Sequence, residues 1–313
     1  MSTTSPASSP SSASSTVAGI YARLGALALF ATLDALVKWL GDSYDPFQMM
    51  LFRSTVALVP LYFLYRSQGG LRLIRSTRPV LQFLRILSGF GSLFGFFYLL
   101  PRMPLVDLYA ISYAAPLFMV GLAAAMLGES VGWRRWSAVG VGFVGVLIML
   151  EPWTISIHWL SLLVLLATFS YSLSTVLTRL ISRYDHDAAT IFWFCLFASL
   201  VSLVGAIPNW KWPSLADWFW LCSLGLIGGV GQILVTRALR LAPASTLAPF
   251  DYSSIALAVL FGYLWFKEEP SRSVWFGLPL VIGSGLYILY RERVRAREVR
   301  RASREAVAAN ARD

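Results

Sequence analysis

Six charged side chains lie within long apolar stretches of the chain, and five of them are the residues best suited to bind a polar ligand there. These five are Asp34, Lys38, Arg53, Arg85 and Asp251, whereas Arg237 lies close enough to the end of its stretch to extend to the membrane surface. A charge in the hydrocarbon of a membrane costs about 2.5–3.5 kcal/mol on insertion scales, so such side chains usually face the interior of a helix bundle. Arginine binds carboxylates and phosphates through paired N–H groups, whereas aspartate binds cations or exchanges a proton. Together they favour a zwitterionic or anionic solute, such as an amino-acid derivative.

Two of these charges are four residues apart. Asp34 and Lys38 therefore share one face of a helix, and in the simplest interpretation they form an internal ion pair. Arg53 is expected at a similar depth in the next apolar segment. It either pairs with Asp34, which is a structural role, or remains unpaired and binds a carboxylate or phosphate of the solute.

Arg85 and Asp251 leave a similar choice open. Arg85 lies a short way inside its apolar segment, from where its head group can also extend to the membrane surface. Asp251 follows Pro249, which can kink a helix. It either titrates or contacts a cationic group during transport, or it serves as a cap or hydrogen-bond partner. Aromatic hydroxyls complete the predicted substrate site, and these belong to Tyr98, Tyr113, Tyr171 and Tyr252, with Tyr109 offering a similar surface.

A glycine pattern typical of dinucleotide-binding sites is the other chemical motif. Residues 140–145, GVGFVG, match G-x-G-x-x-G, which binds a pyrophosphate when it follows a strand and precedes an acidic residue by about 20 positions. Here the flanks are apolar, and no carboxylate lies near Leu165. Small residues let membrane helices approach closely, so we expect these glycines to pack helices. We predict no catalytic residue, no cofactor and no metal, because no ligand spacing joins the cysteines and histidines, Cys195, Cys222, His158 and His186.

The composition indicates which elements position these residues. Of the 313 residues, 57% are hydrophobic and 13% are charged, and the mean hydropathy is +0.64. A soluble domain is about 45–50% apolar and about 25% charged. About 20 apolar residues span a bilayer as a helix. We predict an all-α polytopic membrane protein whose ten spans are about 19–40, 46–66, 80–100, 105–127, 133–150, 158–179, 188–208, 217–237, 245–266 and 272–290.

Basic residues set the predicted orientation, because loops rich in Lys and Arg remain cytoplasmic. Ten basic residues lie in the loops of one side against four in the loops of the other, before the Arg-rich C-terminal tail is counted. Both termini are therefore expected in the cytoplasm. Residues 1–18 form a predicted disordered tail, since Ser, Thr, Pro and Ala bury little apolar surface. Residues 291–313 form a predicted basic tail that contacts membrane lipids rather than nucleic acid.

The chain resembles itself at a shift of 139 residues. Pro104 then aligns with Pro243, Glu129 with Glu268 and Trp136 with Trp275, and no gap is needed between positions 104 and 150. Two halves of five spans follow, 19–150 and 151–290. Because five is odd, the second half enters the membrane with the opposite orientation. Inverted repeats are frequent in secondary transporters, where substrate binds between the halves near the bilayer midplane.

Several longer motifs resemble a known family. DALVKWL (34–40), FRSTVAL (52–58), RILSGFGSLFGFFYLLPRMPLVDLYAISYAAPLF (85–118) and GESVGWRRWSAVGVGFVGVLIM (128–149) are similar to the EamA-type transporters of the drug/metabolite transporter superfamily. The resemblance implies ten helices in two inverted EamA repeats and movement of small organic metabolites across a bacterial inner membrane. The second half departs from the pattern, since FDYSS (250–254) replaces the SYAAP type and Lys267 replaces Gly128.

These observations favour a secondary transporter that moves a small organic metabolite by alternating access. The expected partners are that metabolite and membrane lipids, with a homodimer left open and no nucleic acid. Two alternatives are a membrane-embedded enzyme that modifies lipids and a sensor or scaffold that does not transport. The enzyme would need convergent catalytic groups at one membrane face, and the sequence offers no nucleophile–base pair.

Overall fold

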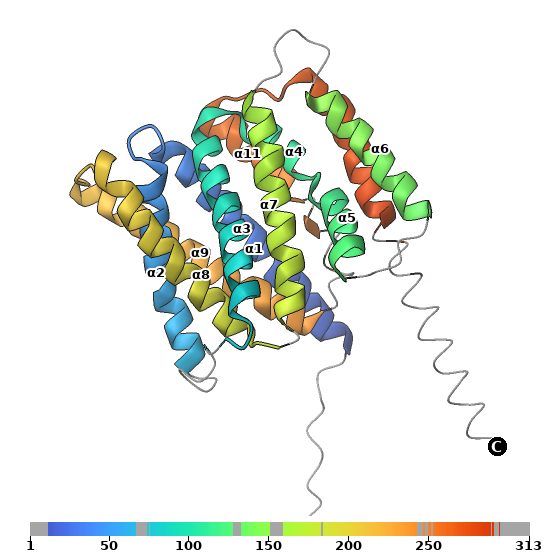
Figure 1. Cartoon of the computed structure of the whole chain (residues 1–313). Helices are drawn as coiled ribbons and strands as arrows, with labels where there is room; N and C mark the ends of the chain where they lie inside the picture. The colour runs from blue at the N-terminus through green and yellow to red at the C-terminus, as the bar shows by residue number, and fades with distance from the viewer. Residues whose placement is uncertain are drawn as a thin grey trace, which may run out of the picture.

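The computed structural model is built of α-helices throughout the part of the chain that it describes, which is residues 12–66, 74, 76–127, 133–150, 159–182, 184–242, 247, 250–251, 253–288, 290 and 294 (Figure 1). Most of the two predicted tails lies outside these residues. The helices are α1 (Ser12–Leu40), α2 (Pro46–Arg66), α3 (Pro79–Leu99), η2 (Leu100–Arg102), α4 (Leu105–Ser112), α5 (Ala115–Leu127), α6 (Trp133–Leu150), α7 (Trp159–Ile181), α8 (Asp187–Ala206), η3 (Ile207–Asn209), α9 (Leu215–Leu241) and α11 (Ser253–Phe266). A further helix covers Arg272–Ile288.

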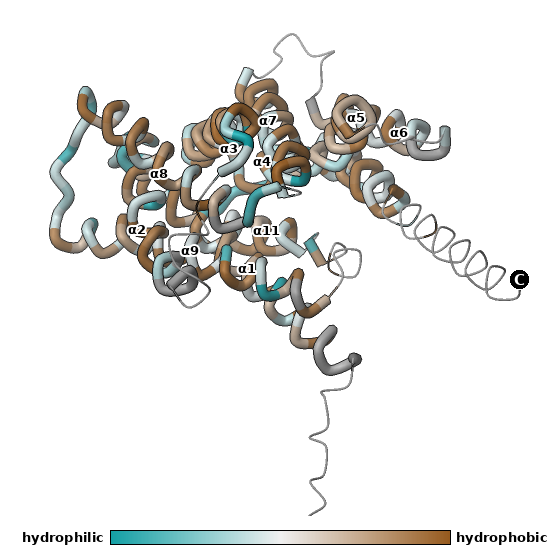
Figure 2. The backbone as a smooth tube through the Cα atoms, turned by 60° about the horizontal axis from the view of Figure 1, so that its bottom comes forward, coloured by the Kyte–Doolittle hydropathy of each residue, from teal (hydrophilic) through white to brown (hydrophobic). Residues whose placement is uncertain are grey.

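Helix is the local structure that these apolar segments favour, because it satisfies every backbone N–H and C=O without water. Figure 2 shows that apolar residues dominate most of the helices. Six segments of the described residues are long and apolar enough to cross a membrane: Val17–Leu40, Pro79–Arg102, Leu105–Leu127, Trp159–Ile181, Ala189–Asn209 and Leu215–Leu239. Three shorter apolar helices accompany them, Trp136–Met149, Ser253–Phe266 and Arg272–Ile288, and α2 has 21 residues but is less apolar.

The 139-residue repeat is visible in the helix boundaries. α5 ends at Leu127 and α11 ends at Phe266, which is 127 + 139. α6 begins at Trp133, and the last apolar helix begins at Arg272, which is 133 + 139. The packing repeats as well, because α1 lies along α9 and its repeat equivalent α7 lies along α3, the equivalent of α9. Similar sequence segments therefore adopt similar structures in similar surroundings.

Helices from the two halves of the sequence are interleaved. The most extensive pairings among the described helices are α3 with α7, α1 with α9, and α2 with both α9 and α8. Small residues allow the α2–α9 contact, since a Cβ added at Gly229 would lie 2.5 Å from Pro60 Cγ, and one added at Gly225 would lie 2.5 Å from Val56 Cβ. Close packing of this kind stabilises the helix pair, because lipid provides no hydrophobic effect between membrane helices.

The glycines of the GVGFVG segment pack one helix against another. α6 lies beside the helix Arg272–Ile288 at one side of the bundle (Figure 1), and a Cβ on Gly277 would come within 2.4 Å of the carbonyl oxygen of Gly145. A Cβ on Gly142 would meet Ser284 Oγ at 2.4 Å, whereas Gly140 has nothing within 4 Å. Helix packing is thus confirmed for two of the three glycines, and the segment lies inside a helix rather than before one.

The predicted span 105–127 is divided into α4 and α5. α4 ends at Ser112, and Tyr113 and Ala114 form a turn in which the Ala114 N–H donates to the Ile111 carbonyl at 3.0 Å. Pro116 explains the interruption, because its ring nitrogen has no hydrogen for the carbonyl one turn earlier. The break lies close to Tyr109 and Tyr113.

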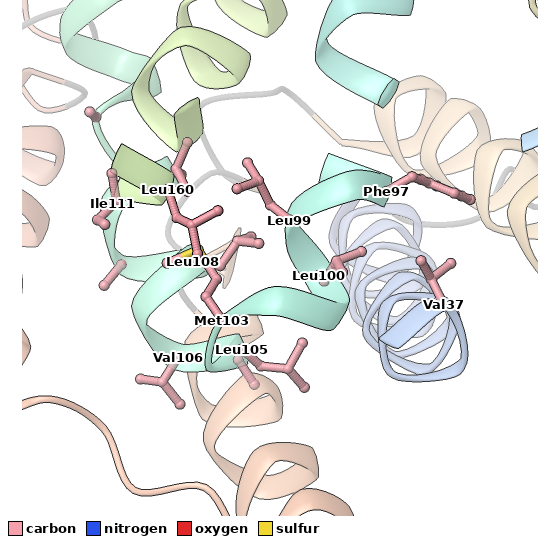
Figure 3. Packing of buried hydrophobic residues seen from close by; sticks show 14 of the residues in the cluster. Val37, Phe97, Leu99, Leu100, Met103, Leu105, Val106, Leu108, Ile111 and Leu160 are labelled. Carbon is pink, nitrogen blue, oxygen red and sulfur yellow. The ribbon is translucent and has the colours of Figure 1, made fainter. Parts of the chain in front are cut away.

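The apolar core contains the junction between η2 and α4. Figure 3 shows side chains of this junction packed with α1 and α7, and those labelled include Val37, Leu99, Leu100, Met103, Leu105 and Leu160. Val37 and Leu99 are 0% exposed, and Leu100 is 1% exposed. In a bilayer such side chains stabilise the fold through close packing, because lipid tails are as apolar as they are. We call this side of the molecule, where α1 ends at Leu40, the Lys38 end, and the opposite side the Arg23 end.

Candidate functional site

One face of α1 carries three charged residues. Arg23 and Asp34 are 11 residues apart, about three helical turns, and Lys38 follows Asp34 after a further four. All three side chains bond to α4, to α11 or to residues next to these helices. The polar face of α1 is therefore directed toward the α4–α11 region rather than toward lipid.

The ammonium group of Lys38 has all its hydrogen-bond acceptors within the protein. Its Nζ forms an ion pair with Glu268 Oε1 at 2.7 Å and donates to the carbonyl oxygens of Leu100 and Met103 at 3.0 and 2.6 Å. Glu268 in turn accepts the backbone N–H of Leu105 at 3.0 Å. The ammonium group has three hydrogens and three acceptors, so none remains for a solute. The expected pair of Lys38 with Asp34 is not formed, because Glu268 is the partner, and Lys38 joins α1 to the second half of the chain.

Asp34 has a tyrosine as its partner. The hydroxyl of Tyr109, on α4, donates to Asp34 Oδ2. The two residues lie opposite each other in the interior, one on α1 and one on α4, just before the interruption between α4 and α5. Discontinuous helices of this kind frequently form substrate sites in transporters, since they expose polar groups at the middle of the bundle.

Arg53 is a cation without a bonding partner among the described residues. Its Nε is enclosed and donates to nothing, and no hydrogen bond or ion pair within 4.0 Å uses its guanidinium group. The guanidinium carbon lies 5.8 Å from the centre of the Phe97 ring, and a Cβ on Gly228 would lie 3.7 Å from Nε. Arg53 therefore projects from α2 into the region where α1, α3 and α9 meet, with Asp34 close enough to attract it electrostatically.

Arg85 is held by two neighbouring helices. Its Nε donates to Thr178 Oγ1 of α7 at 3.2 Å, and its Nη1 donates to the carbonyl of Thr190 of α8 at 3.3 Å. The ring of Phe194 lies 4.9 Å from its guanidinium carbon. Arg85 is thus directed into the protein.

Asp251 forms an ion pair that sequence reasoning did not propose. Arg23 Nε lies 2.6 Å from Asp251 Oδ1, and the hydroxyl of Tyr113 donates to the Asp251 backbone carbonyl at 2.7 Å. Ser254 donates to the same carbonyl at 2.6 Å. The position of Arg23, three turns before Asp34 on one helix face, could have identified it. This cluster links α1 and the α4–α5 turn to α11 at the Arg23 end.

The other predicted tyrosines differ in location. Tyr98 lies toward the Lys38 end, where the guanidinium carbon of Arg102 is 3.7 Å from the centre of its ring. Its ring therefore contacts Arg102 rather than the tyrosines of α4. Tyr171 is 50% exposed and lies near Arg23. Tyr252 lies outside the described residues. The structure therefore gathers two groups, Asp34 with Tyr109 and Arg53 in the interior, and Asp251 with Arg23 and Tyr113 toward the Arg23 end.

The side chains at the centre provide charges and hydrogen-bonding groups. Among the described residues no group of three or more His, Cys, Asp or Glu side chains is arranged to hold a metal ion. The centre offers one unpaired guanidinium group, one carboxylate and one phenol group, those of Arg53, Asp34 and Tyr109. Such groups can donate and accept hydrogen bonds with a polar solute.

The helices, the internal repeat and the polar interior define a multi-pass membrane protein whose charged groups face inward. The chain belongs to the EamA-like transporter family, whose sequence profile matches residues 17–151 and again 158–290. It is accordingly a transporter and not an enzyme, and the lipid-modifying alternative is not supported.

Individual relatives cover most of the chain. It is 28% identical over 263 residues to an S-adenosylmethionine uptake transporter of Rickettsia prowazekii (strain Madrid E), spanning 83% of this chain and 88% of that protein. It is 26% identical over 279 residues to a riboflavin transporter of Brucella anthropi, spanning 85% and 96%. It is 27% identical over 256 residues to the pseudopaline exporter CntI of Pseudomonas aeruginosa, spanning 81% and 89%. A crystal structure with 22% identity has the same fold, with a TM-score of 0.62 over 89% of this chain and 98% of that one.

Proposed function

We propose that the protein is a secondary transporter that moves a small, anionic or zwitterionic organic metabolite across a bacterial inner membrane by alternating access. The ten predicted spans form two inverted halves, 19–150 and 151–290, and both termini face the cytoplasm. The relatives named for S-adenosylmethionine, riboflavin and pseudopaline support a small organic solute, because each moves one. A reporter fused after Asp313 tests the orientation, and a periplasmic signal from it would contradict this topology.

The unpaired guanidinium group of Arg53 is the observation that carries the proposal. A buried charge is usually paired, because its desolvation is costly. Lys38, Arg85 and Asp251 follow this rule, since each has a protein partner. Arg53 does not, although Asp34 is nearby. A solute carboxylate or phosphate would supply the missing acceptor and would be attracted by the second guanidinium group at Arg85.

A difference between the halves supports alternating access. α2 and α9 pack extensively, whereas their repeat equivalents, α8 and α3, pack far less. Two halves with similar sequences and opposite orientations can exchange these packings. One arrangement would then open the centre to one side of the membrane, and the exchanged arrangement would open it to the other.

Flux measurements on proteoliposomes test the proposal. A panel of anionic, zwitterionic and cationic metabolites is offered to the purified protein, and uptake of at least one carboxylate-bearing or phosphate-bearing compound is expected. A charge-assisted hydrogen bond contributes about 1.5–3 kcal/mol, so Arg53→Ala should reduce kcat/KM for that compound about 10- to 150-fold. The matched control is Arg179→Ala, which removes an exposed arginine of α7 and should leave flux unchanged. Undiminished flux in Arg53→Ala would exclude Arg53 from the site, and flux of no compound would contradict the transport function.

A further inference from the structure

We propose that Tyr109 is a positioning residue that keeps Arg53 available for the solute by holding Asp34 away from it. This inference rests on the proposed function, because it assigns a purpose to the unpaired guanidinium group. The hydroxyl of Tyr109 bonds to Asp34 and not to Arg53. It acts through the carboxylate of Asp34.

Asp34 lies between two competing donors. On one side the Tyr109 hydroxyl, from α4, bonds to Asp34 Oδ2. On the other side Arg53, from α2, attracts Asp34 but has no nitrogen within 4.0 Å of its oxygens. A guanidinium group is the stronger partner for a carboxylate, because it carries the opposite charge and can donate two parallel hydrogen bonds, whereas a phenol donates one. The observed choice of the weaker donor therefore requires a geometric cause.

The location of α4 supplies that cause. Four residues after Tyr109, the hydroxyl of Tyr113 bonds to the Asp251 carbonyl and to Ser254, so the end of α4 is tied to the start of α11. On the other side, Arg53 is confined by the ring of Phe97 and by α9 at Gly228. Asp34 therefore meets the Tyr109 hydroxyl while its distance to Arg53 is maintained.

The consequence is that the positive charge of the binding site is not neutralised by the protein's own carboxylate. If Asp34 turned toward Arg53, the two side chains would form an internal ion pair, and an anionic solute would have to displace a carboxylate that is always present. With Asp34 held by Tyr109, a solute carboxylate or phosphate meets an unpaired cation. A cationic group on the same solute meets Asp34. Tyr109 therefore determines preference for solutes that carry a negative group.

Chemical modification of Arg53 tests this inference without a known substrate. Purified full-length protein in lipid nanodiscs is treated with phenylglyoxal, which reacts with accessible unpaired arginines, and the extent of modification at Arg53 is measured by peptide mass spectrometry. Arg53 of the wild type should react. Tyr109→Phe should reduce its modification about tenfold, because Asp34 is then free to pair with the guanidinium group. The double variant Tyr109→Phe/Asp34→Asn should restore it, since the amide carries no charge.

A matched control separates positioning from general damage. Tyr44→Phe also removes a hydroxyl that bonds to a carboxylate, Asp217 Oδ2 at 2.8 Å, but it lies in the turn between α1 and α2. It should leave Arg53 modification at the wild-type level. An unreactive Arg53 in the wild type, an unchanged Arg53 in Tyr109→Phe, or a double variant that is not restored would each overturn the inference. Flux is measured in parallel. A KM for anionic solutes that is raised in Tyr109→Phe and returns to the wild-type value in the double variant supports the inference further. Modification that follows the expected pattern without any flux would retain the positioning role and contradict the transport function instead.

Discussion

Replacement of Lys38 by Met should destabilise the protein, because Lys38 is held by three buried acceptors at the Lys38 end. The substitution preserves most of the side-chain volume and removes the charge. It takes the donor from two buried carbonyls, those of Leu100 and Met103, and leaves Glu268 with the Leu105 N–H as its bond. The side chains of Lys38 and Glu268 are only 8% and 16% exposed, so water compensates little.

The magnitude follows from this burial. Removing one partner of a buried ion pair costs about 3–5 kcal/mol, because the other charge remains uncompensated. Glu268 keeps one hydrogen bond and some exposure, so we expect the lower end, about 3 kcal/mol, for Lys38→Met. Glu268→Gln should cost less, about 1.5–3 kcal/mol, since Lys38 keeps both carbonyl acceptors. The double variant should lose less than the sum, with a coupling of about 1–3 kcal/mol between the two sites.

Equilibrium unfolding in detergent micelles, followed by the fluorescence of the 12 tryptophans, measures these losses. The matched control is Lys267→Met, which removes an exposed cation adjacent to Glu268 and should change stability by less than about 0.5 kcal/mol. A loss below about 1 kcal/mol for Lys38→Met would refute the reasoning. Strict additivity in the double variant would refute it as well, because it would mean that the two charges stabilise the fold independently.

Three further predictions concern other parts of the chain. Gly277→Ala should cost about 1–3 kcal/mol in the same unfolding assay, because its Cβ would meet the Gly145 carbonyl oxygen at 2.4 Å, whereas Gly140→Ala should be neutral or gain up to about 1 kcal/mol in an open helical position. Burial would raise the pKa of Asp185, but hydrogen bonds from Thr77 and Ser76 outweigh it and hold that pKa below its ordinary value. Asp185→Asn should therefore lower the thermal midpoint at pH values above about 4, and the difference from the wild type should vanish as the pH falls through the lowered pKa. Lys267 has a φ of 53°, so Lys267→Gly should stabilise the protein by about 1 kcal/mol, and Lys267→Ala should not.

Much of the helical framework could be predicted because it depends on local properties of the sequence. Apolar segments of sufficient length form helices wherever water is absent, and the start of α6 at Trp133 predicts the start of the helix at Arg272 through the 139-residue repeat. The interruption after Ser112 follows from Pro116, whose missing N–H is likewise a local property.

The partners of the charged residues could not be predicted in the same way. Asp34 and Lys38 share a helix face, yet Asp34 bonds to Tyr109 of α4 and Lys38 bonds to Glu268, which follows α11. Which of several helices faces a side chain depends on tilt and rotation, and helix periodicity fixes neither. The same reason left Arg23 unrecognised, since its partner Asp251 is distant in sequence.

The interleaving of the two halves has a consequence for biosynthesis. The main contacts of α1 are with α9, which begins at Leu215, whereas α1 ends at Leu40. At a translation rate of about 5–20 residues per second, α1 therefore leaves the ribosome roughly 10–35 s before α9 is made. During this interval Arg23 and Lys38, both on α1, lack their ion-pair partners, because Asp251 and Glu268 follow α9 in the sequence. These two ion pairs can therefore form only after most of the chain has been made.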